Sequence, residues 1–134
     1  MAESMILVAD ARQEQRDQLA AALVRAGLTE RIVSSESGRR LITDYVRALQ
    51  RGEAVRAIVL DLNLSVLGGK TCSIAVRCIE QAFEQPPVPI LFLSAKELDA
   101  NLKRVMTYVK SSGFLQHQSA DASVVVEALR GILS

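Results

Sequence analysis

The 134-residue sequence is poor in residues that mark several common classes of protein. It has two cysteines, Cys72 and Cys78, whose separation of six residues suits neither a zinc site nor a disulfide framework. Two thiols in or near the core are the simpler interpretation, which predicts a reducing, cytoplasmic location. The only histidine, His117, has no evident nucleophile beside it, so the sequence gives no support for hydrolytic catalysis.

Long apolar runs and an excess of one charge are also lacking. No run reaches the roughly 18 apolar residues that a membrane span needs. The start, MAESMILVAD, lacks the basic segment of a signal peptide, so none is expected. Lys and Arg number 16 against 15 Asp and Glu, for a net charge of +1. Because this balance creates no strong field, we expect neither nucleic acid nor a membrane as a partner.

The sequence does contain short apolar runs that alternate with helical patterns. It is 49% hydrophobic and 23% charged, which is typical of one globular domain, expected over 1–134 with no output domain. The apolar runs predict strands at 5–9, 31–35, 57–62, 89–94 and 113–117. Helices are expected at about 12–27, 37–52, 71–83, 97–111 and 121–133. This alternation predicts an α/β fold, a doubly wound parallel five-stranded sheet with helices on both faces.

Two of the expected helices carry apolar positions that bear on packing. In the first, Val24 is expected on the core face with its apolar neighbours. The last helix has a main apolar stripe and a second one that contains Val126 and Leu133. Because a surface helix usually needs one stripe, the second predicts contact with a partner or with another copy of the chain in a homodimer. Scattered surface apolar residues are the alternative.

The segment AIVLDLNLSVLGGKT, at 57–71, raises the question of phosphate binding. Gly69, Lys70 and Thr71 match the end of a P-loop, G-x-x-x-x-G-K-[ST]. The first glycine of that motif would fall at Leu64, whose side chain blocks the tight wrap around a phosphate. We therefore expect Gly68 and Gly69 to form a turn into a helix. Nucleotide or flavin binding at DARQEQ is also disfavoured, because that segment has no glycine or Ser/Thr cluster.

Polar residues stand at the ends of the expected strands, where the crevice of a doubly wound sheet lies. Asp10 and Asp61 end the first and third strands, which are neighbours in such a sheet, and Ser94 ends the fourth. Two close carboxylates repel each other, and Mg²⁺ binds one or two carboxylates together with phosphate oxygens. The alternative is that each aspartate caps the helix that follows it.

Four segments, ILVAD, IVLDLNLSVLGG, PILFLSA and GFLQH, resemble the landmarks of response-regulator receiver domains (the CheY-like superfamily) over nearly the whole chain. The resemblance implies the flavodoxin-like strand order 2-1-3-4-5. It also implies that Asp61 accepts a phosphoryl group from a histidine kinase or phosphotransfer protein. Asp10, Asp61 and the main-chain carbonyl of Asn63 would then hold Mg²⁺.

The same resemblance implies a switch. Ser94 and Ala95 would bind the phosphoryl group, and Phe114 would turn inward when the hydroxyl of Ser94 shifts. This movement would alter the face made by 97–111, 113–117 and 121–133, which would bind a downstream protein. The chain would then be a signalling protein and not an enzyme, at most assisting its own phosphorylation and dephosphorylation.

Two positions depart from the receiver pattern. Ala11 stands where a second acid usually follows Asp10, so we expect Mg²⁺ to bind weakly or not at all. His117 and Gln118 stand where the family has a lysine and a proline. A histidine is mostly neutral at pH 7, because its ordinary pKa is about 6.5. The phosphate side of the site has therefore lost a permanent positive charge.

Three side chains are candidates to replace that charge: Arg12, Lys96 and a protonated His117. If protonated His117 replaces the lysine charge, we expect phosphorylation to become more efficient as the pH falls below about 7. Two interpretations follow from these departures. One is a phosphorylation-dependent switch, and the other is a pseudo-receiver that acts as a protein-interaction module without phosphorylation.

Overall fold

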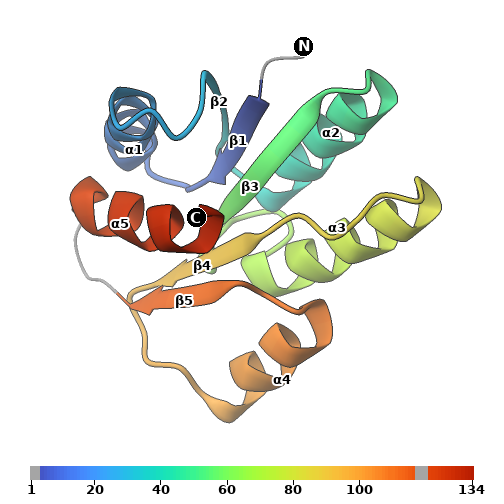
Figure 1. Cartoon of the computed structure of the whole chain (residues 1–134). Coiled ribbons are helices and arrows are strands. Elements are labelled where there is room, and N and C mark those ends of the chain that lie inside the picture. The colour runs from blue at the N-terminus through green and yellow to red at the C-terminus, as the bar shows by residue number, and fades with distance from the viewer. Residues whose placement is uncertain (1–3, 117–120) are drawn as a thin grey trace.

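The computed structural model describes residues 4–116 and 121–134, in which five strands form one parallel sheet (Figure 1). The strands are β1 (Ser4–Ala9), β2 (Arg31–Ser35), β3 (Ala54–Asp61), β4 (Ile90–Ser94) and β5 (Gly113–Gln116). Their order is β2-β1-β3-β4-β5, as expected, and every neighbouring pair is parallel. The expected fifth strand included His117, which lies outside the described residues.

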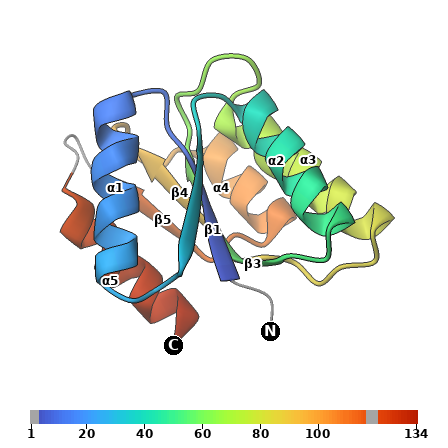
Figure 2. The same cartoon turned by 90° about the horizontal axis from the view of Figure 1, so that it is seen from above.

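Helices cover both faces of the sheet, which confirms the predicted doubly wound α/β architecture. They are α1 (Gln13–Arg25), α2 (Gly38–Gln50), α3 (Gly69–Ala82), α4 (Ala100–Val109) and α5 (Ala122–Leu133). Figure 2 shows α1 and α5 on one side of the sheet and α2, α3 and α4 on the other. The longest described helix has 14 residues, and none of the described helices could span a bilayer.

The core lies in two layers because successive strand residues point to opposite faces. In β1, Met5 and Leu7 pack in the layer under α2, α3 and α4, whereas Ile6 and Val8 pack in the layer under α1 and α5. All four side chains are buried. The unbroken apolar runs of the sequence are therefore explained by strands that are covered on both faces.

Side-chain caps mark the starts of α2 and α4. The side chain of Ser37 accepts a hydrogen bond from the main-chain N–H of Arg40, as a cap of α2 should. Asp99 caps α4 in the same way, so α4 begins at Ala100 and not at 97 as expected. Gly52 ends α2 with a φ of 68°, a conformation that costs glycine little.

The expected positions of two apolar residues are wrong. Val24 is exposed on α1, so it is not a core residue. Val126 is buried and packs with Leu133 in the layer that α1 and α5 share. The second stripe of α5 is therefore explained by packing between α5 and α1, and it gives no reason to expect a partner or a second copy there.

Candidate functional site

Two aspartates lie side by side at the carboxyl edge of the sheet. Ala9 pairs with Leu60, so the residues that follow them, Asp10 and Asp61, come out of neighbouring strands at the same level. Asp10 is 3% exposed and Asp61 is 7% exposed. The sheet register thus brings together the two carboxylates that the sequence placed at separate strand ends.

Each aspartate makes the same local hydrogen bond. Oδ1 of Asp10 accepts the main-chain N–H of Arg12 at 2.9 Å, and Oδ1 of Asp61 accepts that of Asn63 at 2.9 Å. Neither aspartate caps a helix, because the N-cap residues of α1 and α3 are Arg12 and Gly68. The capping alternative is therefore wrong, and the hydrogen bonds instead orient both carboxylates in the turns after β1 and β3.

A guanidinium lies against both carboxylates. Nε of Arg12 is 3.5 Å from Oδ1 of Asp10, and Nη2 of Arg12 is 3.7 Å from Oδ2 of Asp61. The Arg12 side chain is 55% exposed, whereas those of Asp10 and Asp61 are 4% and 10% exposed. One permanent positive charge therefore offsets part of the repulsion between two buried acids. Sequence reasoning named Arg12 as a candidate cation, but only the structure shows that it contacts both aspartates.

The β4–α4 segment forms a second wall of the crevice. Ser94, Ala95 and Lys96 line a cavity of about 340 Å³ together with Asn63. The hydroxyl oxygen of Ser94 accepts the main-chain N–H of Lys96 at 3.0 Å, and Lys96 is exposed. The residues assigned to phosphoryl binding on β4 thus face the same cavity as the loop after Asp61.

Phe114 lies in the middle of β5 and pairs with Phe92 of β4. It is partly buried against the core layer beneath α2, α3 and α4. His117 and Gln118, the other sequence-derived positions of β5, lie outside the described residues.

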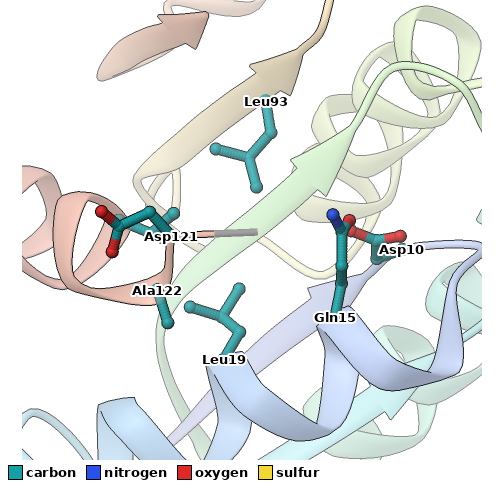
Figure 3. A pocket seen from close by; sticks show the side chains of 7 residues that line it. Asp10, Gln15, Leu19, Leu93, Asp121 and Ala122 are labelled. Atoms are coloured by element: carbon teal, nitrogen blue, oxygen red, sulfur yellow. The ribbon is translucent and has the colours of Figure 1, made fainter. Parts of the chain in front are cut away.

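Gln15 is a neighbour of Asp10 that sequence reasoning missed. Both residues line a cavity of about 10 Å³, into which the side chain of Gln15 extends from α1 (Figure 3). The amide oxygen of Gln15 is buried with no hydrogen-bond partner among the described residues. A cavity of this size holds about one water, so Asp10 has no room for a ligand on this flank. Hydrogen bonds from Ser123 lower the pKa of Asp121, another lining residue.

The donor set at the two aspartates is poor for a divalent metal ion. The metal that the receiver resemblance implies would need oxygen ligands from Asp10, Asp61 and Asn63. Ala11 contributes no carboxylate, and the described residues contain no group of three or more His, Cys, Asp or Glu side chains that could hold a metal. Because Arg12 contacts both carboxylates, a metal ion would have to displace it, so this site does not fit Mg²⁺ as it stands.

Gly68 and Gly69 lead into α3, as expected: Gly68 is the N-cap residue, and the Gly-Lys-Thr segment, 69–71, begins the helix. A Cβ at Gly69 would lie 2.6 Å from the carbonyl oxygen of Asp61 and 2.8 Å from Cα of Leu62, so only glycine allows this close contact between helix and strand. Nζ of Lys70 donates a hydrogen bond to Oδ1 of Asn101 at 2.8 Å. These contacts account for the segment without a nucleotide.

Comparisons with known proteins find similar solved structures but no similar sequence family. No family model and no curated protein sequence matches the chain. The chemotaxis protein CheY4 of Vibrio cholerae matches with a TM-score of 0.76 and 20% identity, over 98% of this chain and 100% of that one. The receiver domain of the Arabidopsis thaliana histidine kinase CKI1, complexed with Mg²⁺, matches with a TM-score of 0.80 and 17% identity, over 96% and 90%.

A third neighbour comes from another bacterium. The response regulator receiver protein of Pseudomonas putida matches with a TM-score of 0.74 and 18% identity, over 98% of both chains. All three comparisons cover nearly the full length of the chain. The chain has the fold of the response-regulator receiver domains, as its sequence motifs indicated.

Proposed function

We propose that this chain is a receiver module of two-component signal transduction, in which Asp61 accepts a phosphoryl group. The placement of Asp61 carries the proposal: a buried carboxylate at the end of β3, beside Asp10 and directly before Leu62 and Asn63, which line a cavity together with Ser94. A structural neighbour, the CKI1 receiver domain, belongs to a histidine kinase and has been crystallised with Mg²⁺ and BeF₃⁻.

The transfer is a simple exchange of bonds. An oxygen of the Asp61 carboxylate forms a bond to phosphorus as the bond between phosphorus and a donor histidine nitrogen breaks, and that nitrogen keeps the electron pair. Such transfers depend mainly on positioning and on neutralisation of charge. Arg12 lies within 3.7 Å of the acceptor carboxylate, and Lys96 stands at the rim of the neighbouring cavity.

The response is a change in protein binding. In this proposal Ser94 and Phe114 shift with the phosphoryl group and alter the face of α4, β5 and α5 toward a downstream protein. A histidine kinase or phosphotransfer protein supplies the phosphoryl group, and the chain itself is not an enzyme. Mg²⁺ binds weakly or not at all, because Ala11 replaces an acid.

Intact mass measurement tests the proposal. Purified protein is incubated with acetyl phosphate, with and without Mg²⁺, beside Asp61→Asn and the control Asp17→Asn. Asp17 is an exposed acid on α1, so its substitution removes the same charge away from the crevice. Wild type and Asp17→Asn should gain the mass of one phosphoryl group, and Asp61→Asn should gain none. Equal gain by Asp61→Asn would show that the phosphoryl group is elsewhere.

A second function, that of a pseudo-receiver, is favoured by a specific observation. Arg12 already provides a counter-charge to both aspartates, and Ala11 provides no metal ligand. In this role the chain keeps the fold as an interaction module and does not need phosphate. Wild type would then gain no mass from acetyl phosphate, and Asp61→Asn would bind the downstream partner as well as wild type does.

A further inference from the structure

We infer that Arg12 is a resident cation of the acidic site, which takes the place of a divalent metal ion and keeps Mg²⁺ out. Its guanidinium reaches Asp10 at 3.5 Å and Asp61 at 3.7 Å. Two carboxylates and one guanidinium leave a single net negative charge at these three residues. A dication entering there meets a like charge and gains less from the acids than it would from an unoccupied pair.

The backbone of Arg12 is fixed beside Asp10. Its N–H donates to Oδ1 of Asp10 at 2.9 Å, and its backbone is extended, with a φ of −98° and a ψ of 114°. Arg12 is also the N-cap residue of α1, so the positive end of the helix adds to the potential at Asp10. Nη1 of Arg16 donates to the carbonyl oxygen of Asp10 at 2.7 Å, which ties the turn to α1.

The other oxygen atoms near the site do not make up for the lost coordination. Oδ1 of each aspartate already accepts a main-chain N–H, and Ala11 offers no side-chain oxygen. On the other flank, the cavity of about 10 Å³ beside Gln15 is too small for a hydrated metal ion. A metal ion that bound here would have to move the Arg12 side chain away from both acids.

Arginine suits this role because it stays protonated throughout the physiological pH range. The positive charge is therefore permanent, unlike that of a histidine with an ordinary pKa of about 6.5. Its planar group can also contact two carboxylates at once, which a lysine ammonium does less well. The inference concerns the charge of the site and holds whether or not Asp61 accepts a phosphoryl group.

Titration with MgCl₂ tests this inference without any phosphodonor, so its result is independent of the proposed phosphorylation. Amide signals of Asp10, Asp61 and Asn63 are followed by NMR in wild type, Arg12→Ala and Arg12→Lys, at constant ionic strength. Wild type should show no saturable shift at millimolar Mg²⁺. Arg12→Ala should bind saturably, at least about tenfold more tightly than wild type. Arg12→Lys should lie between them, because it keeps the charge and loses the planar fork.

Arg39→Ala is the matched control. Arg39 lines the cavity beside Ala11, so its loss removes one positive charge close to the site without touching the contacts of Arg12. This variant should behave like wild type. The inference is overturned if wild type binds Mg²⁺ as tightly as Arg12→Ala does, or if Arg39→Ala gains as much affinity. Circular dichroism of each variant before titration shows that the comparison is made on folded protein.

Discussion

Glu80 is a buried acid far from the crevice, and its contacts show how this chain handles charge inside the core. Its carboxylate accepts hydrogen bonds of 2.7 Å from the hydroxyl of Tyr45, from Nη1 of Arg77 and from the main-chain N–H of Val88. Glu80 is 2% exposed. The network joins α2, α3 and the segment that precedes β4, so its loss leaves buried polar groups without partners.

Glu80→Ala should therefore be strongly destabilising. Breaking a buried ion pair by removing one partner costs on the order of 3–5 kcal/mol, because Arg77 then keeps a buried charge. Urea unfolding at neutral pH measures the free energy of unfolding. The control is Glu127→Ala, an exposed acid paired with Arg130 on α5, which should change stability by less than about 1 kcal/mol. Equal effects of the two substitutions would contradict the role of the network.

The two cysteines differ sharply in environment, which predicts selective alkylation. Cys72 is fully buried, and burial raises the pKa of its thiol to about 12, whereas Cys78 is exposed. Only the thiolate reacts quickly with iodoacetamide. Folded protein should take one label, at Cys78, and unfolded protein should take two. Folded Cys78→Ser should remain unlabelled, and a label on Cys72 in the folded protein would show that the core opens there.

Among the elements, the loop between β3 and α3 has an unusual backbone conformation and contacts the start of α2. Val66 and Leu67 have φ values of 45° and 75°, which residues other than glycine rarely adopt. The carbonyl oxygen of Val66 accepts the main-chain N–H of Arg39 at 3.1 Å, and Ser65 bridges to Ser37. The loop that follows Asp61 is thus attached to the start of α2.

Gly38→Ala should loosen this attachment. A Cβ at Gly38 would lie 2.0 Å from the carbonyl oxygen of Leu67, so the loop must move, at a cost of about 1–3 kcal/mol. Gly131→Ala on α5 is the matched control. Its Cβ would meet no atom within 4 Å, and alanine in a helix is favoured over glycine by roughly 0.5–1 kcal/mol. Thermal unfolding should give a lower midpoint for Gly38→Ala and a higher one for Gly131→Ala. A stabilised Gly38→Ala would mean that the loop does not need this close approach.

For the whole molecule, the strand pattern was the most informative part of the sequence. Unbroken apolar runs such as IVLDL predict buried parallel strands, and strand order then places Asp10 beside Asp61. The burial of Val126 has a cause that the sequence pattern does not contain. Val126 is buried because α5 also packs against α1, and a periodic pattern in one helix does not contain the position of its neighbour. The contact of Arg12 with both Asp10 and Asp61 depends likewise on the register of β1 and β3, which no local sequence pattern encodes.

The stability of the whole fold should fall at alkaline pH, because the core holds two weak acids in their neutral forms. Burial raises the pKa of Cys72 from 9.0 to about 12. Burial, and then the hydrogen bond to Glu80, raise the pKa of Tyr45 well above its ordinary 10.0. In the unfolded chain both groups keep their ordinary values. The contribution of each group to the free energy of unfolding is therefore complete below the ordinary pKa of that group. It is lost as the pH rises from there toward the raised pKa.

Comparison with Cys72→Ala isolates the part of this pH dependence that the thiol of Cys72 contributes. Above pH 9.0, the unfolded wild type releases the thiol proton that the folded protein retains. The free energy of unfolding of wild type should then fall more steeply with pH than that of Cys72→Ala, by up to about 1.4 kcal/mol per pH unit. Urea unfolding of both proteins between about pH 8 and 11 gives the two slopes, since the packing cost of the substitution is the same at every pH. Parallel curves would mean that Cys72 ionises in the folded protein as readily as in the unfolded chain, and hence that water reaches the core beneath α2 and α3.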